Sequence, residues 1–253
     1  MNLTAEHIAQ NFLGSTPARK KLLSDNWHFN IFFFLLLTAA ATLPFTTLLM
    51  LPIAAIQLVN WISEWNWKEK WTTLRENASP FTLFVFFSVY LLVIYGFFLS
   101  YNKGRAMAAF DCYLWFLVAP LFLFTQKRHN LTNSRIHMIF MFFAISTVVH
   151  LCIIFFIAIR KYIQTGNDVY LYYEQFSIFR HPSYLAMYAT FAFYVMLDYL
   201  NKTYKSLPVL PKLGLYIALA VLLAGIFFLQ SKAGILVFCI LAVVWFIYHG
   251  KAC

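Results

Sequence analysis

Two long apolar stretches constrain this chain more than any other feature. Residues 29–62 and 213–249 run for 34 and 37 residues, and Lys232 is the only charged residue in either. As single helices they would be roughly 50 Å long, well beyond the ~30 Å hydrocarbon core of a bilayer. Each stretch must therefore turn back near its middle, and each predicts two membrane-spanning helices.

Turn-forming residues show where the two stretches fold back. Pro44 and Pro52 interrupt the first, which favours a tight turn near Leu43–Phe45 and spans at about 29–43 and 46–63. In the second, the segment 231–234 (Ser-Lys-Ala-Gly) is the only one with turn chemistry, which predicts spans at 213–230 and 233–249.

The composition of the whole chain supports a membrane fold. Of its 253 residues, 62% are hydrophobic and 11% charged, which is typical of a polytopic membrane protein rather than of a soluble domain. Four more spans are predicted, at about 80–100, 107–125, 137–159 and 182–199. The expected fold is all-α with about eight transmembrane helices within residues 29–249, between a polar leader (1–28) and a short tail (250–253).

The basic residues predict the orientation of these spans. Of the 19 lysines and arginines, 13 fall on the side of the N-terminus and 6 on the other side. By the positive-inside rule both termini are cytoplasmic. The net charge of +10 then reflects topology, and no nucleic-acid partner is expected. We find no zinc-type spacing, no phosphate-binding glycine loop and no nucleophile elbow, so neither a metal site nor a cofactor is predicted.

The most informative polar segment is Arg180-His181-Pro182, which leads directly into an apolar run. Proline is favoured at the first position of a helix, so Pro182 is expected to begin a helix that His181 caps. A helix N-terminus beside an arginine and a histidine suits an anion such as a phosphate. The alternative is that the Arg-His pair is an interfacial anchor of a membrane helix.

The eight-span topology places Arg180-His181-Pro182 on the extracytoplasmic side, and a second basic turn is predicted on that side. Ser231 and Lys232 lie at the fold-back of the last apolar stretch, so Lys232 is expected level with Arg180 at the extracytoplasmic surface. Such a charge marks a binding site, or else a lysine that reaches the interface from a helix end. Tyr184 follows His181 by three residues and shares its helix face. The tyrosine-rich segment 160–179 favours either sugar stacking or an ordinary aromatic belt.

Four segments together resemble the O-antigen ligase and O-antigen polymerase family of bacterial inner membranes. They are the hairpin broken at Leu43-Pro44 with the following 61–68, the span from Phe110-Asp111 to Pro120-Leu121, the stretch 176–186, and the stretch 231–236.

The resemblance implies metal-independent transfer of a glycan on the periplasmic face. The donor would be an undecaprenyl-diphosphate-linked glycan, and the acceptor lipid A core or another glycan. Arg180 and Lys232 would bind the diphosphate, with His181, Ser231 and Tyr184 as further substrate contacts, because a departing diphosphate needs its charge stabilised. Family members continue into a periplasmic loop that holds the proposed base. No position here matches that loop, so the resemblance assigns no catalytic residue and implies a truncated member.

Two other functions fit parts of the sequence. Membrane methyltransferases that use S-adenosylmethionine on lipid-like substrates share the phrase Arg-His-Pro-Ser-Tyr, although here no glutamate follows Glu174. A non-catalytic transporter of a lipid-linked glycan would use the same cations to guide a diphosphate.

Overall fold

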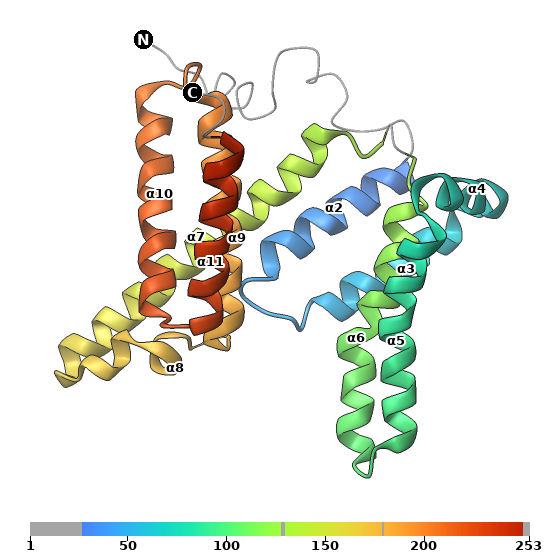
Figure 1. Ribbon diagram of the computed structural model, residues 1–253, viewed down its shortest axis with the longest axis horizontal. Helices are drawn as coiled ribbons and strands as arrows, with labels where there is room; N and C mark the ends of the chain where they lie inside the picture. Colours follow the sequence, from blue (N-terminus) through green and yellow to red (C-terminus); the bar gives the residue numbers. More distant parts are fainter. Residues whose placement is uncertain (1–26, 128–129, 179, 250–253) are drawn as a thin grey trace. The chain divides into compact units, whose positions relative to one another are not determined.

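The computed structural model describes residues 27–127, 130–178 and 180–249, and within these ranges the chain is helical with no strands (Figure 1). Its elements are α2 (Trp27–Thr42), α3 (Met50–Ser63), α4 (Trp67–Asn77), α5 (Pro80–Leu99), α6 (Lys103–Phe124), α7 (Asn133–Thr165), the 3-10 helix η2 (Asp168–Leu171), α8 (Tyr173–Phe176), α9 (Pro182–Thr203), α10 (Val209–Phe228) and α11 (Lys232–His249). The expected all-α class is confirmed for the described residues. The leader and the tail lie almost wholly outside them.

Helices occupy all eight ranges that the sequence marked as spans. Among the described residues three of them, α5, α7 and α10, are both long and apolar enough to cross a membrane, and α2, α3 and the Lys232–Ile247 part of α11 are apolar but shorter. The chain is thus compatible with a membrane protein.

The described helices group into two compact units, and α2 and α3 each contribute residues to both. The first unit contains Phe32–Ile56 and the chain from Ser134 onward. In it, α10 and α11 run beside α9 (Figure 1). Its core joins Leu151 and Ile154 of α7 with Leu185 of α9 and Leu222 of α10, all of them fully buried.

Two glycines allow close helix packing in this first unit. A Cβ atom on Gly225 would lie 2.7 Å from a methyl of Leu151, and one on Gly234 would lie 2.4 Å from the Cβ of Ala186. Small residues let helix backbones approach in this way where lipid supplies no hydrophobic drive for association.

Helix α7 is longer than the sequence predicted. The expected span was 137–159, whereas the helix runs from Asn133 to Thr165, and the residue that follows it, Gly166, has a φ of +66°. The Gly166 N–H donates to the Tyr162 carbonyl at 2.8 Å, as in a left-handed helix terminus. No glycine or proline interrupts the chain between 133 and 165, so the helix had no reason to stop earlier.

Among the described residues, the second unit comprises 27–31 and 57–133. Helices α5 and α6 form a hairpin in it (Figure 1). Helix α5 begins at Pro80 after the cap Ser79, whose hydroxyl accepts from the Thr82 N–H at 3.1 Å. None of its 20 residues is buried. An apolar helix with no fully buried residue fits a lipid environment.

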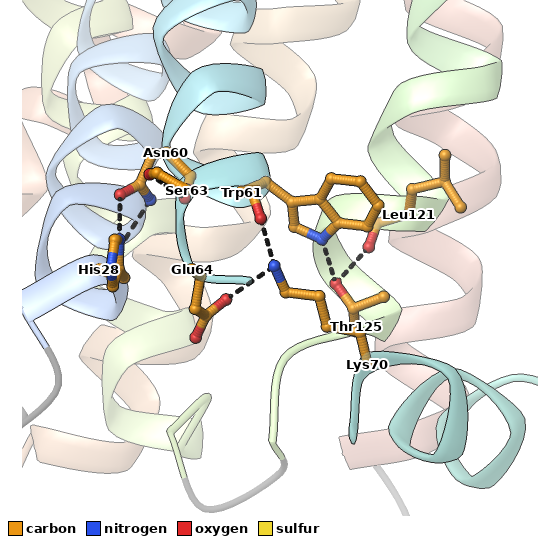
Figure 2. A network of polar contacts seen from close by, with 8 residues as sticks. All are labelled: His28, Asn60, Trp61, Ser63, Glu64, Lys70, Leu121 and Thr125. Carbon is orange, nitrogen blue, oxygen red and sulfur yellow. Dashed lines mark hydrogen bonds and ion pairs between the residues drawn. The ribbon is translucent and has the colours of Figure 1, made fainter. Parts of the chain in front are cut away.

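A buried lysine joins α4 to the end of α3 (Figure 2). The Lys70 ammonium donates to the Trp61 carbonyl, lies 3.2 Å from the Glu64 carboxylate, and sits 4.7 Å from the centroid of the Trp61 ring. The indole of Trp61 in turn donates to Thr125 Oγ1 at 2.9 Å. Lys70 is only 5% exposed, so its charge is used inside the protein rather than in solvent or at headgroups.

The Gly234 contact predicts that substitution by alanine changes the free energy of unfolding differently at two glycines. Gly234→Ala should lower the free energy of unfolding by about 1–3 kcal/mol, since the new methyl must displace Ala186. The control Gly214→Ala in α10 has nothing within 4 Å of the added Cβ and should be neutral or stabilising by up to about 1 kcal/mol, because alanine favours helix. Unfolding of the purified protein in detergent measures both. Equal effects of the two changes would contradict the packing.

The Lys70 network gives a second prediction. Lys70→Met should lower the free energy of unfolding by about 3 kcal/mol, because the Trp61 carbonyl and the Glu64 carboxylate lose a buried cationic donor. Lys68→Met, on the exposed side of the same helix, should stay within about 0.5 kcal/mol of the native protein. A loss of similar size in both variants would mean that Lys70 does not anchor α4.

Candidate functional site

The start of α9 has the geometry that the sequence predicted. The helix begins at Pro182, and His181 caps it, its Nδ1 accepting from the Ser183 N–H at 3.3 Å. His181 itself is exposed, and its ring lies edge-on to Tyr184 with centroids 6.0 Å apart. The predicted helix start and cap are therefore confirmed, and the His181 imidazole and the Tyr184 phenol lie next to each other at the N-terminus of α9.

Arg180 is held by the chain before it and by the end of α2. The Ser177 hydroxyl donates to the Arg180 carbonyl, and the guanidinium Nη2 donates to the Leu43 carbonyl at 2.9 Å. Its Nε is buried and has no hydrogen-bond acceptor among the described residues. The guanidinium is therefore positioned by one fixed contact and retains donors that are not used.

The end of α2 takes part in this arrangement, which the sequence did not indicate. The Ser146 hydroxyl of α7 donates to the Ala41 carbonyl, while Arg180 binds the next carbonyl but one, at Leu43. The last carbonyls of a helix lack intrahelical donors and carry the negative end of its dipole, so a hydroxyl and a cation stabilise them. His150 is fully buried nearby, with Phe45 edge-on to its ring at 4.7 Å.

The turn before α11 places Ser231 and Lys232 differently from each other. Ser231 is buried, and its hydroxyl accepts from the Gly234 N–H at 3.2 Å, which makes it a helix cap. Lys232 is the first residue of α11 and is exposed. Gln230 adopts a φ of +46°, so the chain reverses direction sharply between α10 and α11. Of this pair, Lys232 is the side chain accessible to a ligand.

Packing of α11 on α9 brings the two helix starts to one end of the first unit. Gly234, two residues into α11, abuts Ala186, four residues into α9. Further along, the Tyr194 hydroxyl donates to the Phe238 carbonyl at 2.9 Å, so the two helices run parallel. The starts of α9 and α11, and with them the positive ends of the two helix dipoles, therefore lie on the same side of the first unit (Figure 1).

The tyrosines near this end divide between surface and core. Tyr184 is 60% exposed, whereas Tyr188 packs edge-on against Phe143 at 5.4 Å. In the expected outward segment, Tyr172 stacks on Phe228 with centroids 5.7 Å apart. Thus Tyr184 is open to a ligand, and Tyr172 and Tyr188 serve packing.

No protein-family model matches the chain, and neither the curated proteins nor the solved structures contain a significant match. Within the described ranges, no three His, Cys, Asp or Glu side chains lie close enough together to hold a metal ion.

The Arg180 contact predicts unequal effects of removing the two site cations. Arg180→Gln should lower the free energy of unfolding by about 1.5–3 kcal/mol, because the Leu43 carbonyl loses a charged donor. Lys232→Gln should change it by less than about 0.5 kcal/mol, because Lys232 is exposed. Unfolding in detergent measures both. A stable Arg180→Gln variant would show that the guanidinium does not stabilise the end of α2.

Proposed function

We propose that this chain spans a bacterial inner membrane eight times, with both termini cytoplasmic, and binds the diphosphate of an undecaprenyl-diphosphate-linked glycan at the starts of α9 and α11. The glycan would be transferred on the periplasmic face to lipid A core or to another glycan, the reaction implied by the resemblance to O-antigen ligases and polymerases.

The contact between Gly234 and Ala186 carries this proposal. It brings the starts of two helices and two basic turns, far apart in sequence, to the same end of one unit. A diphosphate has two anionic centres, so two neighbouring helix N-termini with a cation each are complementary to it.

The state of the two cations supports binding of an anion. The buried Arg180 Nε has no acceptor among the described residues, and a buried donor left unsatisfied costs about 1–3 kcal/mol. A phosphate oxygen reaching it would remove that cost. Lys232 is exposed and bears a flexible point charge, able to meet the second phosphate without rearrangement of the helices.

The eight-span threading agrees with the contacts inside the first unit. If the N-terminus is cytoplasmic, the connections α2–α3, α7–α9 and α10–α11 all lie on the periplasmic side. The Arg180–Leu43 hydrogen bond joins the first two connections, and the Gly234–Ala186 contact joins the helix starts that follow the last two. Contacts between connections assigned to opposite sides would have argued against this threading.

In the transfer step, the bond between the anomeric carbon and the phosphate oxygen breaks, and an acceptor hydroxyl oxygen bonds to that carbon. Arg180 and Lys232 would stabilise the charge that develops on the departing diphosphate. The acceptor proton requires a base, to which we assign no residue.

Carriage of the lipid-linked glycan without reaction is a second candidate. One observation favours it: the two basic turns offer cations, whereas the Nδ1 of His181, a ring nitrogen at the start of α9, already accepts a hydrogen bond from the Ser183 N–H. Such a set binds an anion but does not activate a hydroxyl.

Binding of undecaprenyl diphosphate to the purified protein in detergent tests the site. Lys232→Gln should weaken binding about tenfold or more, the value of one charged hydrogen bond. The control Lys205→Gln removes an exposed charge outside these turns and should bind as the native protein does. An unchanged affinity of the Lys232→Gln variant would show that this lysine does not contact the diphosphate.

Reconstitution separates the candidate functions. Proteoliposomes supplied with the lipid-linked glycan and an acceptor should yield a covalent product if the chain is a transferase, and movement of the glycan lipid alone if it is a carrier. Binding of S-adenosylmethionine with no affinity for the diphosphate would favour the methyltransferase alternative instead.

A further inference from the structure

The solvent-exposed face of α4 carries two basic side chains that form no ion pair among the described residues. Among the charged residues of this helix, Glu69 pairs with Lys127 at 2.5 Å and Lys70 is buried against Glu64. Lys68 and Arg75 are exposed and have no ion-pair partner among the described residues. They are seven residues apart, two helical turns, and so lie on one face.

The opposite face of α4 is fixed to its own unit. Lys70, Thr73 and Leu74 are buried. The Asn77 amide donates to the carbonyls of Phe124 and Gln126 at 2.9 and 2.8 Å. Figure 2 shows the Lys70 contacts that hold the start of the helix. Because these contacts fix the rotation of α4, the face with Lys68 and Arg75 is directed away from the core.

Aromatic side chains accompany the two cations. Trp71 is 58% exposed on α4, and Trp65, just before the helix, is 74% exposed. Exposed tryptophans beside basic residues are typical of the headgroup level of a bilayer, where the indole is partly apolar and its N–H is hydrated. A helix in bulk water would gain nothing by exposing both rings.

Chain continuity places α4 at the end of an apolar helix. It ends at Asn77, and α5, long and apolar enough to cross a membrane, begins at Pro80. If α5 spans the bilayer, α4 lies at the membrane surface, because two residues leave no room for it to be elsewhere. The orientation proposed above makes that surface cytoplasmic.

We infer that the exposed face of α4, formed by Lys68, Trp71 and Arg75, binds the headgroups of anionic phospholipids. Charge complementarity argues for this occupant: two unpaired cations face a leaflet whose anionic lipids attract juxtamembrane lysine and arginine. The inference depends on the membrane-spanning part of the proposed function and not on the glycan site.

Lipid-specific quenching of Trp71 tests the inference. The full chain would be placed in nanodiscs of phosphatidylcholine and phosphatidylglycerol, with bromine on the acyl chains of one lipid at a time. Subtraction of the Trp71→Phe variant isolates the signal of Trp71. Brominated phosphatidylglycerol should quench it preferentially. Each of Lys68→Gln and Arg75→Gln should reduce that preference about fivefold, as expected for one cation near an anionic surface.

The matched control is Arg160→Gln/Lys205→Gln, which removes one exposed arginine and one exposed lysine elsewhere and should keep the preference. Equal quenching by the two lipids in the native protein would overturn anionic selectivity. No quenching by either would overturn the placement of α4 at the lipid surface. Both outcomes are independent of undecaprenyl diphosphate binding, so failure here and failure of the glycan site are distinguishable.

Discussion

The close approach of α11 to α9 is the constraint on which the first unit depends. At the contact, Gly234 leaves no space for even one more methyl group beside Ala186. This fixes the relative height of the two helices, and therefore of the turns that precede them. Without it, Lys232 would be a lone charge at a helix start, and His181 would be only a cap. With it, two positive helix ends share one side, and a doubly anionic ligand becomes the simplest complement.

The sequence indicated local structure well because local structure has local causes. Pro182 and His181 specify a helix start through backbone chemistry, and the fold-back before Lys232 follows from the length of the apolar stretch. The partner of Arg180 could not be predicted, since the Leu43 carbonyl is 137 positions away and carbonyls carry no sequence signal. The burial of Lys70 could not be predicted either. A lysine surrounded by tryptophans gives the same sequence pattern whether it lies at a membrane surface or is buried against the indole rings.

The burial and contacts of the basic side chains distinguish those that stabilise the fold from those that are available to bind a ligand. Lys70 is buried and paired, so its charge holds α4 in place. Arg180 is intermediate: one nitrogen stabilises the end of α2, and another is buried without an acceptor among the described residues. Lys68 and Lys232 are exposed, so their charges are available to headgroups or ligands. Composition alone assigns all four to a positive net charge, whereas their contacts give them different roles.

The most direct measurement for the central claim is the sidedness of the two basic turns. With the native cysteines replaced, His181→Cys and Lys232→Cys would each be reacted with a membrane-impermeant thiol reagent in intact spheroplasts and in inverted vesicles. Both positions should react from the periplasmic side, and neither should react from the cytoplasmic side. Reaction of the two positions from opposite sides would contradict the proposed site, because two helices that start at the same end of one unit must start on the same side of a membrane.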